Sequence, residues 1–354
     1  MVKNIKKIQI KNRTIGPGEP VFIIVEMSGN HNQSFEKAKK IIDEAAKAGA
    51  DAVKIQTYTA DTMTINCDNK YFKVDVDNKW KGKSLYDLYK EAYTPWDWQP
   101  KLKEYVESKG LVFFSSPFDE SAVDFLEDMD VKLYKVASFE INHIPLLKKI
   151  ASTKKPVIIS RGMSSEEEIK LAIKTLEENG CPAIAVLHCV SAYPAKPEQM
   201  NLKTIGDISK KFDVIAGLSD HTITTEIPIA SVALGACIIE KHLTISRKEG
   251  GVDSEFSLES DELKDMVDSI RTVEKSIGKV SYASDKKETK MANYKRSVFV
   301  VRDIQNGEEF TKENIRVIRP GYGMHPKLYE KTLGKTAKGD LKRGEPLKEE
   351  DVNY

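Results

Sequence analysis

The chain has 354 residues, 40% apolar and 31% charged, a composition typical of a globular protein with room for one large and one smaller domain. Its net charge of +1 gives no general attraction to nucleic acid or to a membrane surface, and no apolar run approaches the roughly 20 residues of a membrane span. The amino terminus is too polar for a signal peptide, and the cysteines lack C-x-x-C spacing, so we expect a cytoplasmic protein with reduced thiols.

Short apolar runs and amphipathic segments alternate from the start of the chain. Residues 7–16 alternate in polarity around a turn, which predicts a hairpin that plugs the floor of a barrel. A buried strand is predicted at 21–25. A helix over 37–47 follows, with Ser34 as its N-cap and Gly49 as its stop signal.

A long insertion interrupts this alternation after the next predicted strand, at 52–56. Residues 60–97 are rich in Asp, Asn, Lys and aromatic side chains. A loop of this length inside a compact domain is usually either functional or disordered. The aromatic residues favour an ordered insertion.

Beyond the insertion, strands and helices alternate again as far as residue 276. Eight βα units predict a (β/α)8 barrel, with right-handed crossovers and active-site loops at the carboxyl ends of the strands. An open doubly wound sheet is the alternative, but the glycine-rich phosphate turn expected after its first strand is absent from the sequence. The remaining helices are predicted at 98–109, 119–128, 145–152, 165–179, 200–211, 227–234 and 260–276.

The carboxyl-terminal part of the chain contains an internal repeat. Residues 278–293 are polar and predict a linker between a barrel domain over 1–277 and a small domain over 294–354. Within the small domain, DIQNGEEFTKENI at 303–315 matches DLKRGEPLKEEDV, which ends at residue 352. Two copies of one short turn-strand-helix unit predict a small pseudo-symmetric, β-rich domain.

Polar side chains follow most of the predicted strands, and this ring marks the expected catalytic face of the barrel. Each member, taken alone, is also explained by a strand-end hydrogen bond. Lys54 and Lys135, however, would be buried ammonium groups, which are costly without an anion such as a phosphate or a carboxylate. The ring comprises Glu26, Lys54, Gln56, Ser116, Lys135, Ser138, Glu140, Ser160, His221, Glu240 and His242.

His221 and His242 end two neighbouring predicted strands. Adjacent parallel strands lie about 4.8 Å apart, so the two imidazoles are able to meet at one site. They suit a divalent metal with open positions, for which we expect Mn²⁺ or Mg²⁺, with Co²⁺ as a further candidate. The alternative is that one or both rings only hydrogen-bond at the rim of the barrel.

The chain resembles the sialic acid synthase family in motifs spread over essentially its whole length: EMSGNHNQS, KIQTYTADTM, SSPFDESAVDFLE, YKVASFEI, KPVIISRGM, YPAKPEQMNL, GLSDHT and IEKH. Its carboxyl-terminal domain resembles the antifreeze-like (SAF) lid of that family. The resemblance implies condensation of phosphoenolpyruvate with an N-acetylated amino sugar, in a domain-swapped homodimer whose lid comes from the other subunit. The segments SGNHNQS, WKGKSLYDLYKEAYTPW and GGVDSEFSLE are most similar to the pseudaminic acid synthase branch.

The resemblance also implies roles for individual residues. Phosphoenolpyruvate would be bound by Lys54, Ser116, Lys135, Ser138, Ser160 and Ser219. The sugar would be bound by Glu26, Gln56, Glu140, Tyr193, Asp253 and, from the lid, Arg319. Catalysis would involve Glu26, Glu240, Lys54 and Lys135, and the metal would be bound by His221 and His242. Two residues depart from the family pattern, Arg161 in place of threonine and Ser191 in place of asparagine.

For the branch indicated, the implied reaction joins phosphoenolpyruvate to 2,4-diacetamido-2,4,6-trideoxy-L-altrose and gives pseudaminic acid and phosphate, with C–O cleavage. Two alternatives stay open. One keeps the chemistry and changes the sugar, as in an N-acetylneuraminate or legionaminate synthase. The other is a non-catalytic sugar-binding barrel, against which the retained lysines and histidines argue.

Overall fold

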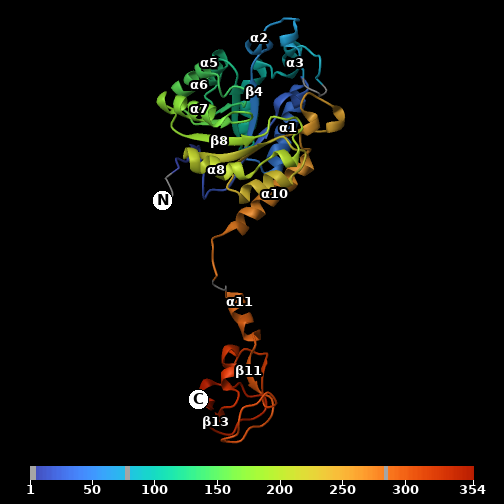
Figure 1. Cartoon of the computed structure of the whole chain (residues 1–354). Helices are drawn as coiled ribbons and strands as arrows, with labels where there is room; N and C mark the ends of the chain where they lie inside the picture. The colour runs from blue at the N-terminus through green and yellow to red at the C-terminus, as the bar shows by residue number, and fades with distance from the viewer. Residues whose placement is uncertain (1–4, 76–79, 283–285) are drawn as a thin grey trace. The chain divides into compact units, whose positions relative to one another are not determined.

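The computed structural model describes residues 5–75, 80–282 and 286–354. The chain divides into two compact units, Met1–Gly278 and Lys279–Tyr354. In the first unit eight parallel strands close into a barrel in the order β10-β3-β4-β5-β6-β7-β8-β9 (Figure 1). The predicted (β/α)8 barrel is therefore confirmed, and the open sheet is excluded.

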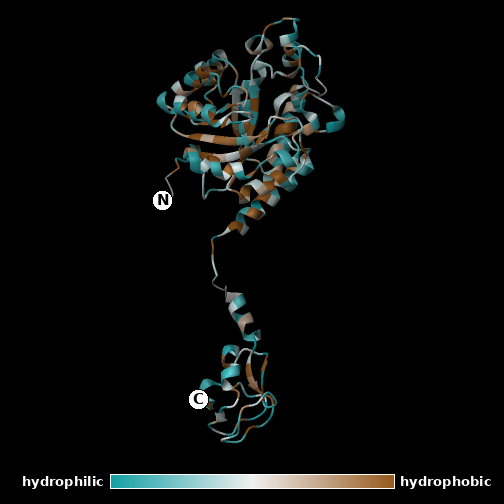
Figure 2. Ribbon diagram, in the orientation of Figure 1, coloured by the Kyte–Doolittle hydropathy of each residue, from teal (hydrophilic) through white to brown (hydrophobic). Residues whose placement is uncertain are grey.

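The barrel strands are short and almost entirely buried, because side chains fill the interior and helices cover the outside. Figure 2 shows them as largely apolar ribbons, whereas the surrounding helices alternate between apolar and polar residues. The strands are β3 (Phe22–Glu26), β4 (Ala52–Thr57), β5 (Val112–Pro117), β6 (Tyr134–Val136), β7 (Val157–Ser160), β8 (Ile184–Cys189), β9 (Ile215–Asp220) and β10 (Ile238–His242).

The helices lie where the amphipathic periodicity predicts them, to within a few residues at each end. Ser34 accepts a hydrogen bond from the Lys37 N–H at the start of α1, and Gly49 ends this helix with φ of 86°. No helix in the described part of the chain is long and apolar enough to cross a membrane. The barrel helices are α1 (Phe35–Ala48), α4 (Gln99–Ser108), α5 (Glu120–Asp128), α6 (Ile144–Ser152), α7 (Glu166–Glu178), α8 (Lys203–Phe212), α9 (Glu226–Ala233) and α10 (Ser260–Ile277).

The predicted amino-terminal hairpin is present. β1 (Ile8–Ile10) and β2 (Arg13–Ile15) pair in antiparallel fashion. Their isoleucines belong to the same buried apolar cluster as Phe22 and Phe114 from the barrel interior. Since Phe22 is the first residue of β3, the hairpin closes the amino-terminal end of the barrel, and the opposite end is left for polar side chains.

The described part of the insertion is structured, as its aromatic content predicts. It contains two short helices that the sequence analysis did not predict, α2 (Ala60–Met63) and α3 (Leu85–Ala92). Residues 76–79 of the insertion lie outside the described residues. Gln33, in the loop after β3, donates hydrogen bonds of 3.0 and 2.6 Å to the carbonyls of Glu91 and Tyr93 and so ties that loop to the insertion.

The second unit begins with a short helix, α11 (Lys286–Met291), inside the segment predicted to be a linker. That prediction missed the helix because the segment is polar throughout and lacks an apolar face. The other elements of the unit are β11 (Ser297–Val300), β12 (Ile315–Ile318), α12 (Tyr329–Thr332), β13 (Thr336–Ala337) and β14 (Val352–Asn353).

The internal repeat of the second unit is structural as well as sequential. Asp303 accepts a hydrogen bond from the Arg343 N–H, and Asp340, its counterpart in the second copy, accepts one from the Asn306 N–H, both at 2.8 Å. The residues that follow the two aspartates exchange a pair of backbone hydrogen bonds, each 2.9 Å long. Each copy therefore supplies the other with the same contacts, as in a pseudo-twofold arrangement.

Candidate active site

Each interior strand face changes from apolar to polar toward its carboxyl end. Successive side chains of a strand point to opposite faces, so residues two apart share a face. In β3 the interior residue Ile24 is followed by Glu26, and in β10 Ile238 is followed by Glu240. The polar ring predicted from the strand ends therefore gathers at the carboxyl end of the barrel, opposite the hairpin.

Two ammonium groups and two carboxyl groups meet at the centre of this ring. Lys54 forms an ion pair with Glu26, and its Nζ lies 3.6 Å from Glu240 Oε1. Lys135 Nζ approaches the same Glu240 oxygen at 3.7 Å. All four side chains are at most 4% exposed. An anionic ligand would complete the pairing of the two ammonium groups in this buried cluster.

The electrostatics of the cluster distinguish its two glutamates. Burial raises the pKa of Glu26, and the nearby Lys54 only partly offsets it. Burial also acts to raise the pKa of Glu240, but Lys135 and Lys54 outweigh it and hold the pKa of this carboxyl below its ordinary value. Glu240 is therefore the more firmly ionised carboxylate, and Glu26 the better proton carrier.

Serine hydroxyls surround the lysines. Ser116 accepts a hydrogen bond from Lys54 at 3.4 Å, and Ser219 donates one to Glu240 at 3.1 Å. The Ser160 hydroxyl is buried and has no hydrogen-bond partner among the described residues, so it is available to a ligand. The Ser138 hydroxyl, after β6, lies 3.0 Å from the Ser191 hydroxyl, after β8, and β7 lies between these two strands in the barrel.

Three of the residues predicted to bind the sugar are linked around Ser28, which was not predicted as a site residue from the sequence. Gln56 Nε2 donates to Glu26 at 3.1 Å and to Ser28 at 3.3 Å, and the Ser28 hydroxyl donates to Asp253. The backbone of Ser28 has a φ angle of 47°, a value that residues other than glycine rarely adopt. The only sequence signal was its place in SGNHNQS, close behind Glu26.

Glu140 follows β6 and has an unusual environment. Burial raises its pKa to about 7, although Lys135 acts in the opposite direction. Its Oε2 is buried without a hydrogen-bond partner among the described residues. A carboxyl group of this kind is half protonated near neutral pH and is able to donate as well as to accept a hydrogen bond.

The two predicted metal ligands lie side by side. The ring centroids of His221 and His242 are 5.4 Å apart. The ring of Phe256 packs against His242 at 4.9 Å, and the ring of Tyr193 packs against His221 at 4.5 Å. His221 Nδ1 lies 2.9 Å from the Val190 carbonyl, to which it donates, so Nε2 carries the lone pair. His242 Nδ1 is buried and has no hydrogen-bond partner among the described residues.

This donor set fits a divalent metal with open positions. Burial lowers the pKa of both histidines, which keeps the imidazoles neutral as metal binding requires. Among the described residues no group of three or more His, Cys, Asp or Glu side chains is arranged to hold a metal. A metal at His221 and His242 would therefore take its other ligands from water and substrate.

Two predicted features lie elsewhere. Arg319 belongs to the second unit, where it lines a hollow with Met291, Tyr294 and Lys295. Arg161 follows the interior residue Ser160, so strand alternation directs it to the other face. Its guanidinium donates to His188 Nδ1 and to the Gly162 carbonyl.

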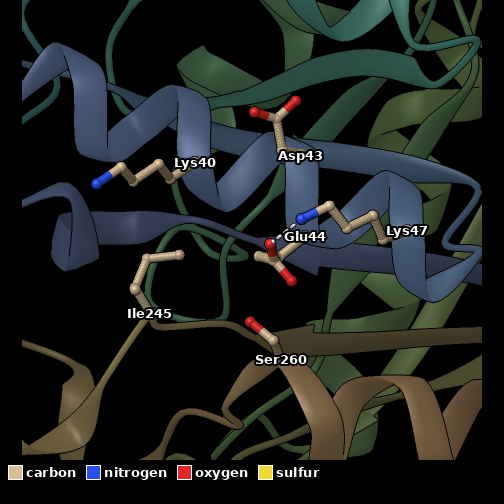
Figure 3. A pocket seen from close by; sticks show the side chains of 6 residues that line it. All are labelled: Lys40, Asp43, Glu44, Lys47, Ile245 and Ser260. Atoms are coloured by element: carbon tan, nitrogen blue, oxygen red, sulfur yellow. Dashed lines mark hydrogen bonds and ion pairs between the residues drawn. The ribbon is translucent and has the colours of Figure 1, made fainter.

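One surface hollow of the barrel unit contains none of the predicted site residues (Figure 3). Three of its charged side chains form ion pairs: Lys47 with Glu44 at 2.6 Å, and Asp43 with Lys109, the residue after α4, at 2.7 Å. The hollow is lined by Lys40, Asp43, Glu44, Lys47, Ile245 and Ser260.

Comparison with known proteins agrees with this site. The NeuB family matches residues 41–282, and the SAF domain matches residues 295–353. A pseudaminic acid synthase of Campylobacter jejuni is 43% identical over 94% of this chain and 96% of its own length. An N,N'-diacetyllegionaminic acid synthase of Legionella pneumophila is 34% identical over 94% of each chain.

A solved structure gives the same result. The N-acetylneuraminic acid synthetase of Leptospira borgpetersenii superposes with a TM-score of 0.72 at 34% identity, over 81% of this chain and 95% of that one. The predicted family resemblance and the SAF domain are thus confirmed. The chain belongs to the NeuB family and is an enzyme of the same kind as these synthases.

Proposed function

We propose that this enzyme condenses phosphoenolpyruvate with 2,4-diacetamido-2,4,6-trideoxy-L-altrose and gives pseudaminic acid and phosphate. The observation that carries the proposal is the convergence of two buried lysines on Glu240, at 3.6 and 3.7 Å, in the polar end of the barrel. The choice of sugar is supported by the higher identity to the pseudaminic acid synthase, 43%, than to the legionaminic acid synthase, 34%.

Phosphoenolpyruvate matches the cationic side of the site. Its phosphate and carboxylate supply the negative charge that Lys54 and Lys135 need in a buried environment. Ser116 bonds Lys54, Ser219 bonds Glu240, and the buried Ser160 hydroxyl has no partner among the described residues; these three hydroxyls would orient the phosphate oxygens. Binding this substrate also brings its C3 carbon against the part of the site that holds the sugar.

The sugar is bound by the opposite, acidic side. Gln56 and Asp253, which are joined through Ser28, form hydrogen bonds with the hydroxyl and acetamido groups of the sugar. Glu140 contributes a carboxyl group that is half protonated near neutral pH. A divalent metal, when bound at His221 and His242, supplies Lewis-acid polarisation of the aldehyde oxygen. The protein holds both substrates in register, which lowers the entropic part of the barrier.

The two central glutamates divide the proton transfers. As C3 of phosphoenolpyruvate attacks the aldehyde carbon, Glu26 in its protonated form donates to the developing alkoxide. Water then adds at the positively charged C2 and transfers a proton to Glu240, which the lysines keep ionised. The tetrahedral intermediate then collapses: the bond between C2 and the bridging phosphate oxygen breaks, the C2 hydroxyl becomes the carbonyl, and its proton leaves with the phosphate.

A direct assay tests the proposal. Purified protein is incubated with phosphoenolpyruvate, Mn²⁺ and a panel of N-acetylated sugars, and phosphate and the nonulosonate product are quantified. We expect turnover with the 2,4-diacetamido sugar of the altro configuration. With phosphoenolpyruvate labelled by ¹⁸O at the bridging position, C–O cleavage places the label in the released phosphate.

The other outcomes identify the alternatives. Turnover with N-acetylmannosamine alone would identify an N-acetylneuraminate synthase. Turnover with the 2,4-diacetamido sugar of the manno configuration alone would identify a legionaminate synthase. Binding of a sugar without phosphate release from any member of the panel would favour a non-catalytic barrel and would overturn the proposal.

A further inference from the structure

A buried ion pair lies on the outer face of β9 and β10, beside the positions of the two histidines. In β9 and β10, strand alternation directs Ser219 and Glu240 into the barrel and places Asp220 and Lys241 on the outer face. The β9–β10 ladder ends at the pair Asp220–Lys241. Both of these side chains are 0% exposed, although neither belongs to the polar ring of the site.

Lys241 is bound by more than its counter-ion. Its ammonium donates to the Asp220 carboxylate, to the Thr222 carbonyl and, at 3.3 Å, to the Thr224 carbonyl. Asp220 in turn accepts from the Thr222 N–H at 3.1 Å and from the Thr222 hydroxyl at 2.9 Å. Both charged groups are thus hydrogen-bonded within the turn, which is the condition under which burial of an ion pair is tolerated.

This turn carries His221. The ladder between β9 and β10 stops one residue before it, so no strand pairing with β10 holds the His221 backbone. His242, in contrast, is still paired through its backbone with Glu26 of β3. The side chain of Lys241 takes the place of the missing ladder, because it connects β10 to the carbonyls of the residues that follow His221.

A second set of contacts holds the same turn from the other side. The Ala195 N–H donates to the His221 carbonyl at 3.0 Å, and the His221 ring is anchored on the Val190 carbonyl at 2.9 Å. The turn therefore lies between the loop after β8 and the ammonium group of Lys241. Loss of either side would leave the ring of His221 free to move relative to that of His242.

We propose that Asp220 and Lys241 are positioning residues that set the separation of the His221 and His242 rings for a shared divalent metal. This inference rests on the proposed function only in that a metal is bound there. Neither residue touches the interior of the barrel, and both act through the backbone of the turn. Such outer contacts commonly change metal affinity by about 10- to 100-fold when removed.

Three variants separate positioning from stability. Lys241→Met and Asp220→Asn each leave one polar group of the network without its partner and will lower the melting temperature. The double variant Asp220→Asn/Lys241→Met removes both charges, so its stability will recover part of this loss. In the double variant the carbonyls of Thr222 and Thr224 still lack the ammonium donor. We therefore expect its dissociation constant for Mn²⁺, measured by electron paramagnetic resonance, to be about 10- to 100-fold higher than that of wild type.

Asp51→Asn is the matched control. Asp51 pairs with Arg13 at 2.9 Å and with Arg271 at 3.0 Å, and it lies at the amino-terminal end of β4, away from the histidines. This variant will lose stability without a change in Mn²⁺ affinity. Wild-type affinity in the double variant, or an equal loss of affinity in Asp51→Asn, would overturn the positioning role.

A metal-free measurement distinguishes failure of this inference from failure of the proposed function. In protein labelled with ¹⁵N-histidine, the Nδ1–H resonance of His221, assigned by its loss in His221→Ala, reports the bond to Val190. We expect this proton to exchange faster in the double variant than in wild type or Asp51→Asn. Absence of Mn²⁺ binding in wild-type protein would refute the metal site itself. Separately, an unchanged exchange rate of the His221 Nδ1 proton in the double variant would refute the positioning of His221.

Discussion

At the scale of single residues, three glutamates of the site, Glu26, Glu140 and Glu240, differ in pKa because their neighbours differ. Two lysines surround Glu240 and keep it ionised, whereas burial dominates at Glu26 and raises its pKa. Glu140 has the pKa closest to neutrality, about 7, because burial outweighs the influence of Lys135. The sequence placed all three at strand ends but contained no information about which would hold a proton.

The Glu140 carboxyl predicts a pH dependence of activity. In the proposed reaction its protonated form donates a hydrogen bond to the sugar, so we expect kcat/KM for the sugar to fall as the pH rises through about 7. Glu140→Gln stays neutral, and this decline will be absent from its pH profile. A profile of the variant that still falls near pH 7 would assign the titration to another group.

The same shift predicts a pH dependence of stability. The pKa of Glu140 is higher in the folded protein than in the unfolded chain, so its stabilising contribution is present below about pH 4.5 and is lost as the pH rises through about 7. The free energy of unfolding of Glu140→Gln relative to wild type will therefore increase between pH 5 and pH 8. Urea titrations at both pH values measure this difference, and an unchanged difference would contradict it.

His242 provides a test of the metal site at the same scale. His242→Ala removes one of the two proposed nitrogen ligands, so we expect metal-dependent turnover to be abolished while the circular dichroism spectrum stays that of the folded protein. His143→Ala is the control, because His143 is exposed and its side chain makes no cap hydrogen bond at α6. Full turnover of His242→Ala after treatment with a chelator would refute the metal role.

At the scale of elements, β9 and β10 bring the site together because they pack unusually closely. Gly217 lies in β9, and a Cβ atom there would approach the Ile238 carbonyl to 2.5 Å and a Leu187 methyl to 2.6 Å. Any larger residue would push β9 away from β10 or β8. The glycine therefore permits the strand spacing on which the histidine pair depends.

Gly217→Ala is expected to destabilise the barrel by about 1–3 kcal/mol, the usual cost of overpacking a core. Gly206→Ala is the matched control. Gly206 lies in helix α8, and a Cβ atom there would approach only the Leu234 carbonyl, at an ordinary van der Waals distance of 3.5 Å. That change will be neutral or stabilising by about 0.5–1 kcal/mol, as expected for glycine in a helix. Urea unfolding measures both, and equal effects would contradict the close-packing argument.

At the scale of the whole molecule, the two units divide the proposed work. The barrel holds the charged cluster, and the SAF unit holds Arg319, which is exposed beside Met291 and Tyr294. We propose that this arginine binds the sugar in the barrel of a partner chain within a homodimer. Light scattering coupled to size-exclusion chromatography tests the dimer directly.

Arg319→Ala will raise the KM for the sugar far more than the KM for phosphoenolpyruvate, because the arginine serves only the sugar. Arg316→Ala is the control: Arg316 is also exposed, on β12, a few residues before Arg319. Steady-state kinetics with each substrate varied in turn will separate the two effects. Equal changes in both KM values would argue against a contact between the lid and the sugar.

Much of the architecture followed from local information. The period of the apolar residues and the caps, such as Ser34 and Gly49, predicted the barrel helices and strands in their order. The positions of His221 and His242 at the ends of neighbouring predicted strands also indicated that their rings can meet at one site, and the structure places the ring centroids 5.4 Å apart. These properties depend on residues close in sequence and on the regular geometry of a strand.

Other features appeared only in the tertiary structure. Ser28 joins Asp253 across 225 positions, and it does so from a left-handed backbone conformation that sequence periodicity does not encode. Arg161 departs from the family pattern, and its guanidinium bonds His188 of β8, a contact that the substitution alone did not reveal. Sequence likewise does not show that Lys241 holds the turn after β9.

The sequence by itself therefore determined the fold, the family and the set of polar strand ends. Only the tertiary structure decided which of those side chains touch, which carboxyl groups are buried beside lysines, and which residues hold the ligands in place. The physical reason is range: strand and helix periodicity arises between near neighbours. Burial and charge pairing depend on strands that the closed barrel brings together from distant parts of the chain.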